Sequence, residues 1–407
     1  MKILFVSQYY SPEPFSNATV VNSLVARGNK VEVLTAVPNY PQGVFYSGYS
    51  SGSPMTEVMN GVKVHRVRTV SRGTTKLRLL LNYLAFVWFG MFHACFGRFE
   101  RPDVVFLSQL SPVLMALPAI VLSRRFNVPL VYWVQDIWPE SAVHTLGLRN
   151  KLLVKLLNIL CGWLYRRADF TFVQSSAFPP MISRYGVPRE RIAVFPNTAE
   201  EHYRPVNLRH AEAALLPKTG FKIMFAGNIG ESQDFDTIIE AAKMLKYRAD
   251  IQWIVIGSGR DCERVQYRVK QFGLDDIFHF LGRYPSTQMP YFFAHADAML
   301  VSLLRNDIFA LTVPYKVQSY MACGKPIIGS LDGEGARIIR EAGAGLCAEP
   351  QSPASFSEAV ITLVEASQDQ RDQMAEASRS YFLKNYHQTM VFDQLESNLR
   401  RFIDDDT

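Results

Sequence analysis

One stretch decides the fold: Ile-Met-Phe-Ala-Gly-Asn-Ile-Gly, residues 223–230. Its first four residues form an apolar run of strand length, two glycines mark the turn that follows, and a helical pattern begins at about Asp234. Glycine lets a backbone approach a phosphate closely, and a helix N-terminus offers free N–H groups. Glycines also serve turn geometry in many loops. The stretch therefore predicts a strand–turn–helix unit and leaves a bound phosphate as one of two interpretations.

Similar apolar runs alternate with helical patterns along the chain. In the first half they cover residues 3–6, 31–34, 62–67, 104–107, 130–134 and 170–173. In the second half they cover residues 223–226, 253–256, 277–280, 298–302 and 326–329. Such alternation predicts an α/β fold with mostly parallel sheets that are covered on both faces.

The alternation breaks at a polar stretch over residues 200–218, where we place a domain boundary. The 407 residues, 48% of them hydrophobic, suffice for two cores. We therefore predict two Rossmann-like domains, residues 1–200 and 201–384, and a C-terminal helix over 385–407. Two such sheets facing each other form a cleft, and ligands bind beyond the carboxyl ends of the strands.

Composition narrows the function classes. The five cysteines are scattered and no CxxC or HExxH occurs, which indicates reduced thiols and no metal site. The apolar run at Met1–Phe5 is too short for a signal peptide and reads as a first strand. The net charge of +6 is uneven, because residues 63–101 hold eight Lys or Arg and one acid. This patch favours an anionic surface; nucleic acid is the alternative, but no nucleic-acid-binding motif overlaps it.

A basic, apolar helix is predicted near residues 74–98. Its central part, 79–96, is almost entirely apolar and approaches the length of a membrane span. A span would place the strands at 62–67 and 104–107 on opposite sides of a bilayer and break the sheet. We therefore expect a helix seated at a membrane interface, with an ordinary buried helix as the alternative.

Lys316 is the sharpest candidate in the second half. Thr312 is expected to cap a helix, with Pro314 in its first turn and Gly324 at its end. Lys316 then lies in the first turn, where a cation opposes the helix dipole. If a diphosphate is bound there, the helix N–H groups and Lys316 share one anion, and the lysine becomes favourable. The alternative is that the Lys316 side chain simply points to water.

Further candidates for a nucleotide-diphosphate site lie in the turns that follow the second-half strands. Glu334 lies between two glycines at a strand end. Its carboxylate can accept hydrogen bonds from sugar hydroxyls. Alternatively, it accepts them from helix N–H groups and only compensates the positive charge of the helix N-terminus. The full set of candidates is Gly227, Asn228, Gly230, Gly257, Gly259, Arg283, Tyr284, Thr312, Lys316, Ser319, Gly333, Glu334, Gly335 and Ala336.

In the first half, Asp136 is the first carboxylate after the apolar run 130–134, so it is expected at the cleft. It can orient a donor sugar, accept a proton from an attacking hydroxyl, or cap the next helix. The loop after the first strand carries Tyr9, Glu13 and Asn17, which can bind acceptor sugar hydroxyls or serve as ordinary loop and capping residues.

Taken together, these motifs resemble those of the large family-4 retaining glycosyltransferases, over nearly the whole chain. The similarity is greatest to the branch that builds bacterial O-antigen, capsule and colanic-acid units, including N-acetyl-L-fucosaminyl transferases. The motifs are Gln8-Tyr9-Tyr10-Ser11-Pro12-Glu13, Pro38-Asn39-Tyr40-Pro41-Gln42-Gly43, Asp136-Ile137-Trp138-Pro139-Glu140-Ser141, Phe195-Pro196-Asn197, Ala226-Gly227-Asn228-Ile229-Gly230, and Lys316 to Pro326 with Gly333-Glu334-Gly335.

The resemblance implies two facing Rossmann-like domains of the GT-B type, with the C-terminal helix crossing back to the first. It implies a retaining transfer without metal or other cofactor, from a UDP-sugar held by the second domain to a polyprenyl-diphosphate-linked saccharide held by the first. The enzyme is then expected on the cytoplasmic, inner face of the plasma membrane. The expected catalytic residues are Asp136, Lys316 and Glu334.

The chain departs from the family at several positions. Two glutamates common in the family are replaced by Leu311 and Ser319, and an Arg and a Lys of its glycine loop by Asn228 and Gln233. Phosphate neutralisation would then depend mainly on Lys316. Two other functions remain open: a nucleotide-sugar epimerase with the same fold, and a non-catalytic membrane-docking partner of a polysaccharide assembly complex.

Overall fold

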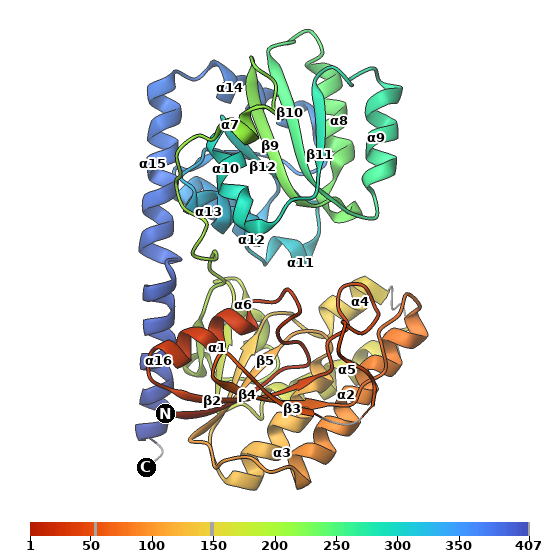
Figure 1. The fold of residues 1–407 in the computed structure, drawn as a ribbon, viewed down its shortest axis with the longest axis vertical. Helices are drawn as coiled ribbons and strands as arrows, with labels where there is room; N and C mark the ends of the chain where they lie inside the picture. The colour runs from red at the N-terminus through yellow and green to blue at the C-terminus, as the bar shows by residue number, and fades with distance from the viewer. Residues whose placement is uncertain (53–54, 147–149, 406–407) are drawn as a thin grey trace. The chain divides into compact units, whose positions relative to one another are not determined.

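The computed structural model describes residues 1–52, 55–146 and 150–405, and its contacts divide the chain into two compact units (Figure 1). The first unit comprises Met1–Pro196 together with the chain from Phe392 onward, and the second comprises Asn197–Val391. The sequence places these boundaries near residues 200 and 384. Each unit is built on one mostly parallel sheet, which confirms the predicted α/β class.

The first unit contains an eight-stranded sheet in the order β3-β4-β2-β1-β5-β6-β7-β8. Every neighbouring pair is parallel except β3 and β4. The strands are β1 (Lys2–Val6), β2 (Lys30–Ala36), β3 (Met55–Met59), β4 (Val62–Val67), β5 (Val104–Gln109), β6 (Leu130–Val134), β7 (Phe170–Val173) and β8 (Ile192–Val194).

Helices cover both faces of this sheet. Right-handed crossovers place α2, α3 and α5 on one face and α1 on the other, and α2 packs along α3. All residues of β5 and β6 are buried, which is why these strands read as unbroken apolar runs. The helices are α1 (Asn17–Ala26), α2 (Lys76–Phe96), η1 (Val113–Met115), α3 (Ala116–Phe126), α4 (Glu140–Leu146), α5 (Lys151–Tyr165), α6 (Phe178–Ser183), η2 (Arg189–Arg191) and α16 (Gln388–Asp405).

The C-terminal helix α16 belongs mainly to the first unit. Asp393 pairs with Arg27 at 2.9 Å, and the Phe402 ring lies 3.9 Å from that of Phe170. Phe392 meets Phe195 at 6.0 Å. The preceding helix α15 instead packs on α12 of the second unit.

The second unit contains a six-stranded, fully parallel sheet in the order β11-β10-β9-β12-β13-β14. The strands are β9 (Phe221–Asn228), β10 (Ile251–Ser258), β11 (Phe278–Gly282), β12 (Ala298–Ser302), β13 (Ile327–Ser330) and β14 (Gly345–Ala348). The helices are α7 (His210–Ala213), η3 (Glu231–Gln233), α8 (Phe235–Met244), α9 (Cys262–Gln271), η4 (Ser286–Gln288), α10 (Met289–Ala294), α11 (Asp307–Ala310), α12 (Tyr315–Ala322), α13 (Gly333–Glu341), α14 (Pro353–Glu365) and α15 (Gln368–Asn385).

All eleven apolar runs fall on strands, and three strands were missed. The missed ones are β3, β8 and β14. β3 is an edge strand without a buried residue, and β8 has only 3 residues. β14 combines a glycine, a leucine and two small residues, and only its last residue is buried. Weakly buried strands leave little apolar signal in the sequence.

Candidate active site

Lys316 lies at the carboxyl edge of the second sheet. It occupies the first turn of α12, and its amine donates to Oε1 of Gln233. The amine also sits 3.9 Å from the centre of the Phe225 ring. Burial lowers the pKa of Lys316 to about 7. Within the described residues no carboxylate forms an ion pair with this amine, so a half-buried cation faces the turn at Gly227 without a counter-charge.

The glycines of the two neighbouring turns have different roles. A Cβ at Gly227 would lie 3.5 Å from the Lys316 amine, whereas a Cβ at Gly257 would lie 1.8 Å from the carbonyl oxygen of Gly227. A Cβ at Gly259 would lie 2.0 Å from the carbonyl oxygen of Ile229. Gly257 and Gly259 are therefore required for the two turns to pack together. Only the Gly227 turn borders the lysine.

The start of α12 differs from the prediction. The helix begins at Tyr315 with Pro314 at the N-cap position, and Thr312 lies outside it. The Thr312 hydroxyl donates to the carbonyl of Phe309 at 3.0 Å, so the prediction of a Thr312 cap is wrong. Proline's missing N–H costs nothing at a helix start, which makes Pro314 a compatible substitute. Ser319, one turn further, is buried and donates to the Tyr315 carbonyl at 3.3 Å.

The N-terminus of α13 meets that of α12. Gly335 packs so closely that a Cβ there would lie 3.1 Å from Cδ of Pro314, and Gly333 abuts the carbonyl of Ala310. Glu334 is almost fully buried and pairs with Arg337 at 2.9 Å. Two helix N-termini therefore converge at one edge of the sheet. This arrangement places N–H donors and positive dipole ends at the same edge of the sheet as Lys316, which occupies the first turn of α12.

The remaining donor candidates lie around this edge. Asn228 ends β9 and is exposed, and its amide nitrogen would be 2.8 Å from a Cβ at Gly230. Arg283 is exposed, while the Tyr284 ring packs on Phe292 at 4.7 Å. Ala336 is fully buried inside α13. Arg283 and Asn228 are thus available to a ligand, and Ala336 contributes to the core.

Asp136 follows β6 and takes part in a chain of hydrogen bonds. The Trp138 indole N–H donates to the Ser111 hydroxyl at 2.9 Å, and that hydroxyl donates to Oδ2 of Asp136, also at 2.9 Å. Burial raises the pKa of Asp136, and the bonds from Ser111 act in the opposite direction. The Asp136 carboxylate is oriented by a residue that follows β5, the neighbouring strand.

The three acceptor candidates prove to be buried. Glu13 accepts backbone N–H groups from Asn39 and Tyr40, each at 2.8 Å, and burial raises its pKa to about 7. Asn17 donates to Ser7 and accepts from Ser108 at 2.6 Å. These two side chains therefore hold the loop in place. Tyr9 is also buried, but its hydroxyl accepts a hydrogen bond from Arg72 at 3.3 Å.

Four residues near these candidates were not singled out as functional from the sequence. Gln233 contacts Lys316, Ser111 contacts Asp136, and Arg72 and Tyr83 contact Tyr9. Ser111 and Asp136 are 25 positions apart in the chain, and Gln233 and Lys316 are 83 positions apart. No local sequence motif therefore joins either pair. The sequence feature that could have identified these four residues is their position, either shortly after a predicted strand or in the helix that follows one.

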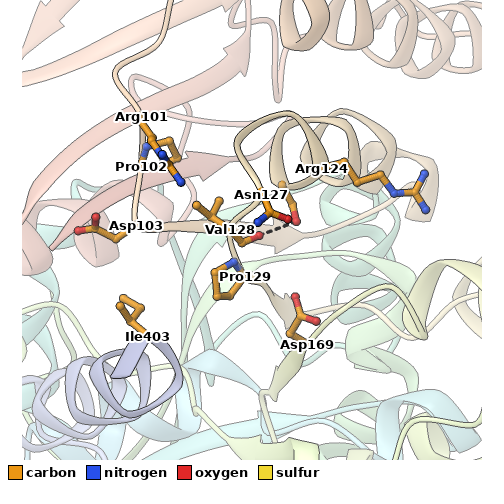
Figure 2. Close-up of a pocket in the computed structure, with 10 residues that line it drawn as sticks. Arg101, Pro102, Asp103, Arg124, Asn127, Val128, Pro129, Asp169 and Ile403 are labelled. Atoms are coloured by element: carbon orange, nitrogen blue, oxygen red, sulfur yellow. Dashed lines mark hydrogen bonds between the residues drawn. The ribbon is translucent and has the colours of Figure 1, made fainter. Parts of the chain in front are cut away.

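A pocket of about 590 Å³ lies at the opposite edge of the first sheet. Asp103, Pro129 and Asp169 come from the amino ends of β5, β6 and β7, and Ile403 of α16 borders them (Figure 2). The two carboxylates accept backbone N–H groups, Asp103 from Lys2 and Asp169 from Leu130. Ligands of parallel sheets bind at the carboxyl edge instead. We therefore do not assign the site to this pocket.

The described ranges contain no group of three or more His, Cys, Asp and Glu side chains placed to hold a metal ion. Basic side chains lie at the carboxyl edge of each sheet, Lys316 in the second unit and Arg72 in the first.

Two family models match the chain. One described as glycosyl transferases group 1 matches residues 208–381, and one described as glycosyl transferase 4-like domain matches residues 18–198. The chain is 26% identical over 371 residues to the putative colanic acid biosynthesis glycosyl transferase WcaI of Escherichia coli (strain K12), covering 86% of this chain and 89% of that one.

Solved structures show the same fold at low identity. Sucrose-phosphate synthase from Thermosynechococcus elongatus has a TM-score of 0.75 and 16% identity, covering 98% of each chain. HepE from Anabaena in complex with UDP has a TM-score of 0.70 and 15% identity, covering 98% of this chain and 100% of that one. WaaG, a glycosyltransferase involved in lipopolysaccharide biosynthesis, has a TM-score of 0.67 and 13% identity, covering 97% of this chain and 98% of that one.

The matches follow the structural division, because each family model covers most of one unit. The predicted resemblance to glycosyltransferases is thereby confirmed, and the N-acetyl-L-fucosaminyl branch stays a prediction. The chain is a glycosyltransferase of the GT-B fold, in which a segment that matches the glycosyl transferase 4-like domain is followed by one that matches glycosyl transferases group 1.

Proposed function

We propose that this enzyme transfers a sugar from a UDP-linked donor to a polyprenyl-diphosphate-linked saccharide, with retention at the anomeric carbon and without a metal ion. The transferred sugar is N-acetyl-L-fucosamine or a similar amino sugar, and the product enters a bacterial surface polysaccharide. Support comes from the similarity to WcaI, which is named for colanic acid biosynthesis, and to HepE, whose structure contains UDP.

The observation that carries the proposal is the environment of Lys316. The Lys316 side chain is partly buried, its amine has no carboxylate partner among the described residues, and the amine lies beside the Gly227 turn. Removing a cation from water without a counter-charge is unfavourable unless a ligand supplies the charge. The diphosphate of a nucleotide sugar has the required charge and size. Lys316 would then stabilise the negative charge that develops on the leaving UDP.

Glu334 and Asp136 complete the proposed chemistry. Glu334, in the first turn of α13, would accept bonds from donor hydroxyls while Arg337 holds its carboxylate in position. Asp136, oriented by Ser111, would steer the acceptor hydroxyl or the donor sugar. Because burial raises the pKa of Asp136, a proton taken from an attacking hydroxyl would be better retained than on an exposed aspartate.

The first domain offers a surface for the inner face of the plasma membrane. On α2, Trp88 and Phe92 are 74% and 62% exposed, and on α5, Leu156 and Ile159 are 55% and 60% exposed. Both helices pack against η1 and contain no Asp or Glu. Apolar faces with basic and no acidic residues favour an anionic lipid surface. The helix α2 has 21 residues and contains an 18-residue stretch with a mean hydropathy of 1.6, so it is long and apolar enough to cross a membrane. It connects two strands of one sheet, however, so we propose that it lies in the interface.

The test is a donor panel. Purified enzyme would be incubated with UDP- and GDP-sugars and a synthetic polyprenyl-diphosphate saccharide, with products identified by mass and anomeric configuration by NMR. The proposal predicts one UDP-sugar that gives a retained linkage. A changed sugar formed from donor alone would support the epimerase instead. Absence of calorimetric heat with UDP would support the docking partner.

A further inference from the structure

Arg72 is the cation of interest at the carboxyl edge of the first sheet. It lies in the connection between β4 and α2, and its guanidinium donates to the Tyr9 hydroxyl at 3.3 Å. The same guanidinium lies over the Tyr40 ring, 5.1 Å from its centre. Among the described residues it forms no ion pair with a carboxylate, unlike the nearby Arg66, which pairs with Glu57. Arg72 therefore carries a charge that no neighbouring side chain neutralises.

The connection that carries Arg72 is held by buried polar groups. The Arg72 backbone N–H donates to Oδ1 of Asn39 at 2.9 Å, and Asn82 of α2 donates to the same oxygen at 3.3 Å. Asn39 is itself fixed through its backbone N–H, which donates to Glu13 at 2.8 Å. Glu13, Asn39 and Asn82 are all buried. A network of this kind sets a loop in one conformation, so Arg72 is presented from a rigid base.

Neutral hydroxyl groups lie beside the guanidinium. Tyr9 and Tyr83 share a hydrogen bond, and burial raises the pKa of both, so both remain protonated at neutral pH. The charge of Asp136 also raises the pKa of Tyr83. Tyr9 is buried and already bonds both Arg72 and Tyr83, so the Arg72 guanidinium and the partly buried Tyr83 hydroxyl remain for a ligand. A guanidinium beside a phenol hydroxyl is suited to phosphate oxygens. The cluster therefore favours an anion.

The apolar side of α2 begins close to this cluster. Leu77, Leu84 and Trp88 are exposed along the helix at near-helical spacing, and Tyr83 lies between them in sequence. An anion that also carries a hydrocarbon chain could place its charge at Arg72 and its chain along α2. Neither feature alone selects such a ligand, but a lipid diphosphate fits both.

We propose that Arg72, held in place by Tyr9 and flanked by Tyr83, binds the diphosphate of the lipid acceptor, while the lipid chain lies along the exposed side of α2. The inference deepens the proposed function, since it rests on that function for the acceptor class. It assigns the acceptor anion to the first domain and keeps it separate from the donor anion at Lys316.

The experiment uses farnesyl diphosphate as a soluble lipid diphosphate, with farnesol and inorganic pyrophosphate as partial ligands. Calorimetry on the full chain is done with saturating UDP, so that the donor site is occupied, and repeated in Lys316→Met. The variants are Arg72→Ala and Arg72→Lys, with Arg68→Ala as matched control because Arg68 is exposed in the same connection. Arg72→Ala should weaken farnesyl diphosphate binding about tenfold or more, since a charge-assisted bond is lost. Arg72→Lys should recover part of it, and Arg68→Ala should change it little.

Two further measurements distinguish binding at Arg72 from a general loss of folding or of surface charge. UDP affinity should be the same in Arg72→Ala and wild type, and farnesol binding should not respond to Arg72. Equal farnesyl diphosphate affinity in Arg72→Ala and wild type would overturn the inference. So would an equal loss in Arg68→Ala, or an equal loss of binding to vesicles of anionic phospholipid, because either would indicate surface charge alone. If UDP does not bind or no sugar is transferred, the proposed function fails, while an Arg72-dependent farnesyl diphosphate affinity would still stand.

Discussion

The Lys316 amine and the Gln233 side-chain oxygen are hydrogen-bonded, although they come from α12 and from η3 at the end of the glycine turn. An amide oxygen orients an ammonium group without neutralising it. The bond therefore fixes the amine beside Gly227 and leaves its charge available. Where the wider family resemblance leads one to expect a second cation, this chain has a neutral residue that positions the first.

Replacing Lys316 with methionine should weaken UDP binding about tenfold or more, since a charge-assisted hydrogen bond to phosphate would be lost. Calorimetry with UDP measures this. Lys246→Met is the control, because Lys246 is exposed just beyond the far end of α8. Unchanged affinity in Lys316→Met would remove Lys316 from the donor site.

UDP binding at pH 8 should take up protons. Burial lowers the pKa of Lys316 to about 7 in the free protein, so most of the amine is neutral at pH 8. A bound diphosphate favours the ammonium form and raises that pKa again. Titrations in Tris and HEPES should therefore give different heats, and the difference should vanish in Lys316→Arg, which is always charged. Identical heats in wild type would mean that the amine is already protonated.

The same lysine should lower stability at neutral pH. The pKa of Lys316 is about 7 in the folded protein and 10.5 for an ordinary lysine, so the unfolded chain binds more protons between those two values. Stability then rises with pH through this window. Lys316→Met should raise the melting temperature of the ligand-free enzyme at pH 7, and it should reduce the increase in stability with pH. A lower melting temperature in Lys316→Met would show that the lysine stabilises the fold and would contradict the prediction.

Gly259→Ala should destabilise the second domain by more than about 3 kcal/mol, because the new Cβ meets a backbone carbonyl that cannot move alone. Gly282→Ala is the control: its φ is +77°, but nothing lies within 4 Å of a Cβ there. It should cost only about 1 kcal/mol, the usual cost of a left-handed conformation. Urea unfolding of both variants gives the comparison. Similar losses would mean that turn packing is not the reason for Gly259.

Ser111→Ala should shift the acidic limb of the rate profile to higher pH. The Ser111 bonds lower the pKa of Asp136, and without them burial acts unopposed. Ser111→Thr keeps a hydroxyl and should behave like wild type. The measurement is kcat/KM against pH for both variants. A uniform loss of rate with an unchanged limb would assign Ser111 to structure alone.

Trp88→Glu and Leu156→Glu should each reduce co-sedimentation with anionic vesicles, because an acid would be placed on an exposed apolar face. UDP affinity should not change. Leu215→Glu is the control, an exposed leucine of the second domain. Full vesicle binding by both variants would exclude this surface as the membrane contact.

The sequence alone determined most of the elements and their order. The apolar runs fell on strands, the domain changes predicted near residues 200 and 384 compare with 196 and 392 in the structure, and the helix predicted near residues 74–98 formed as the single element α2. Lys316 was placed in the first turn of its helix although the cap was misassigned. These features follow from periodicity, glycine and proline, which act within a few residues of each other.

Tertiary structure alone decided which polar groups meet. Glu13 and Asn17, chosen for sugar binding, are buried and hold a loop, while Arg72, Ser111 and Gln233 became the neighbours of the site. A polar residue after a strand has the same local pattern whether it binds a ligand or a backbone N–H. Sheet order and the pairing of distant turns decide between the two, because hydrogen bonds and burial depend on residues that are far apart in the chain.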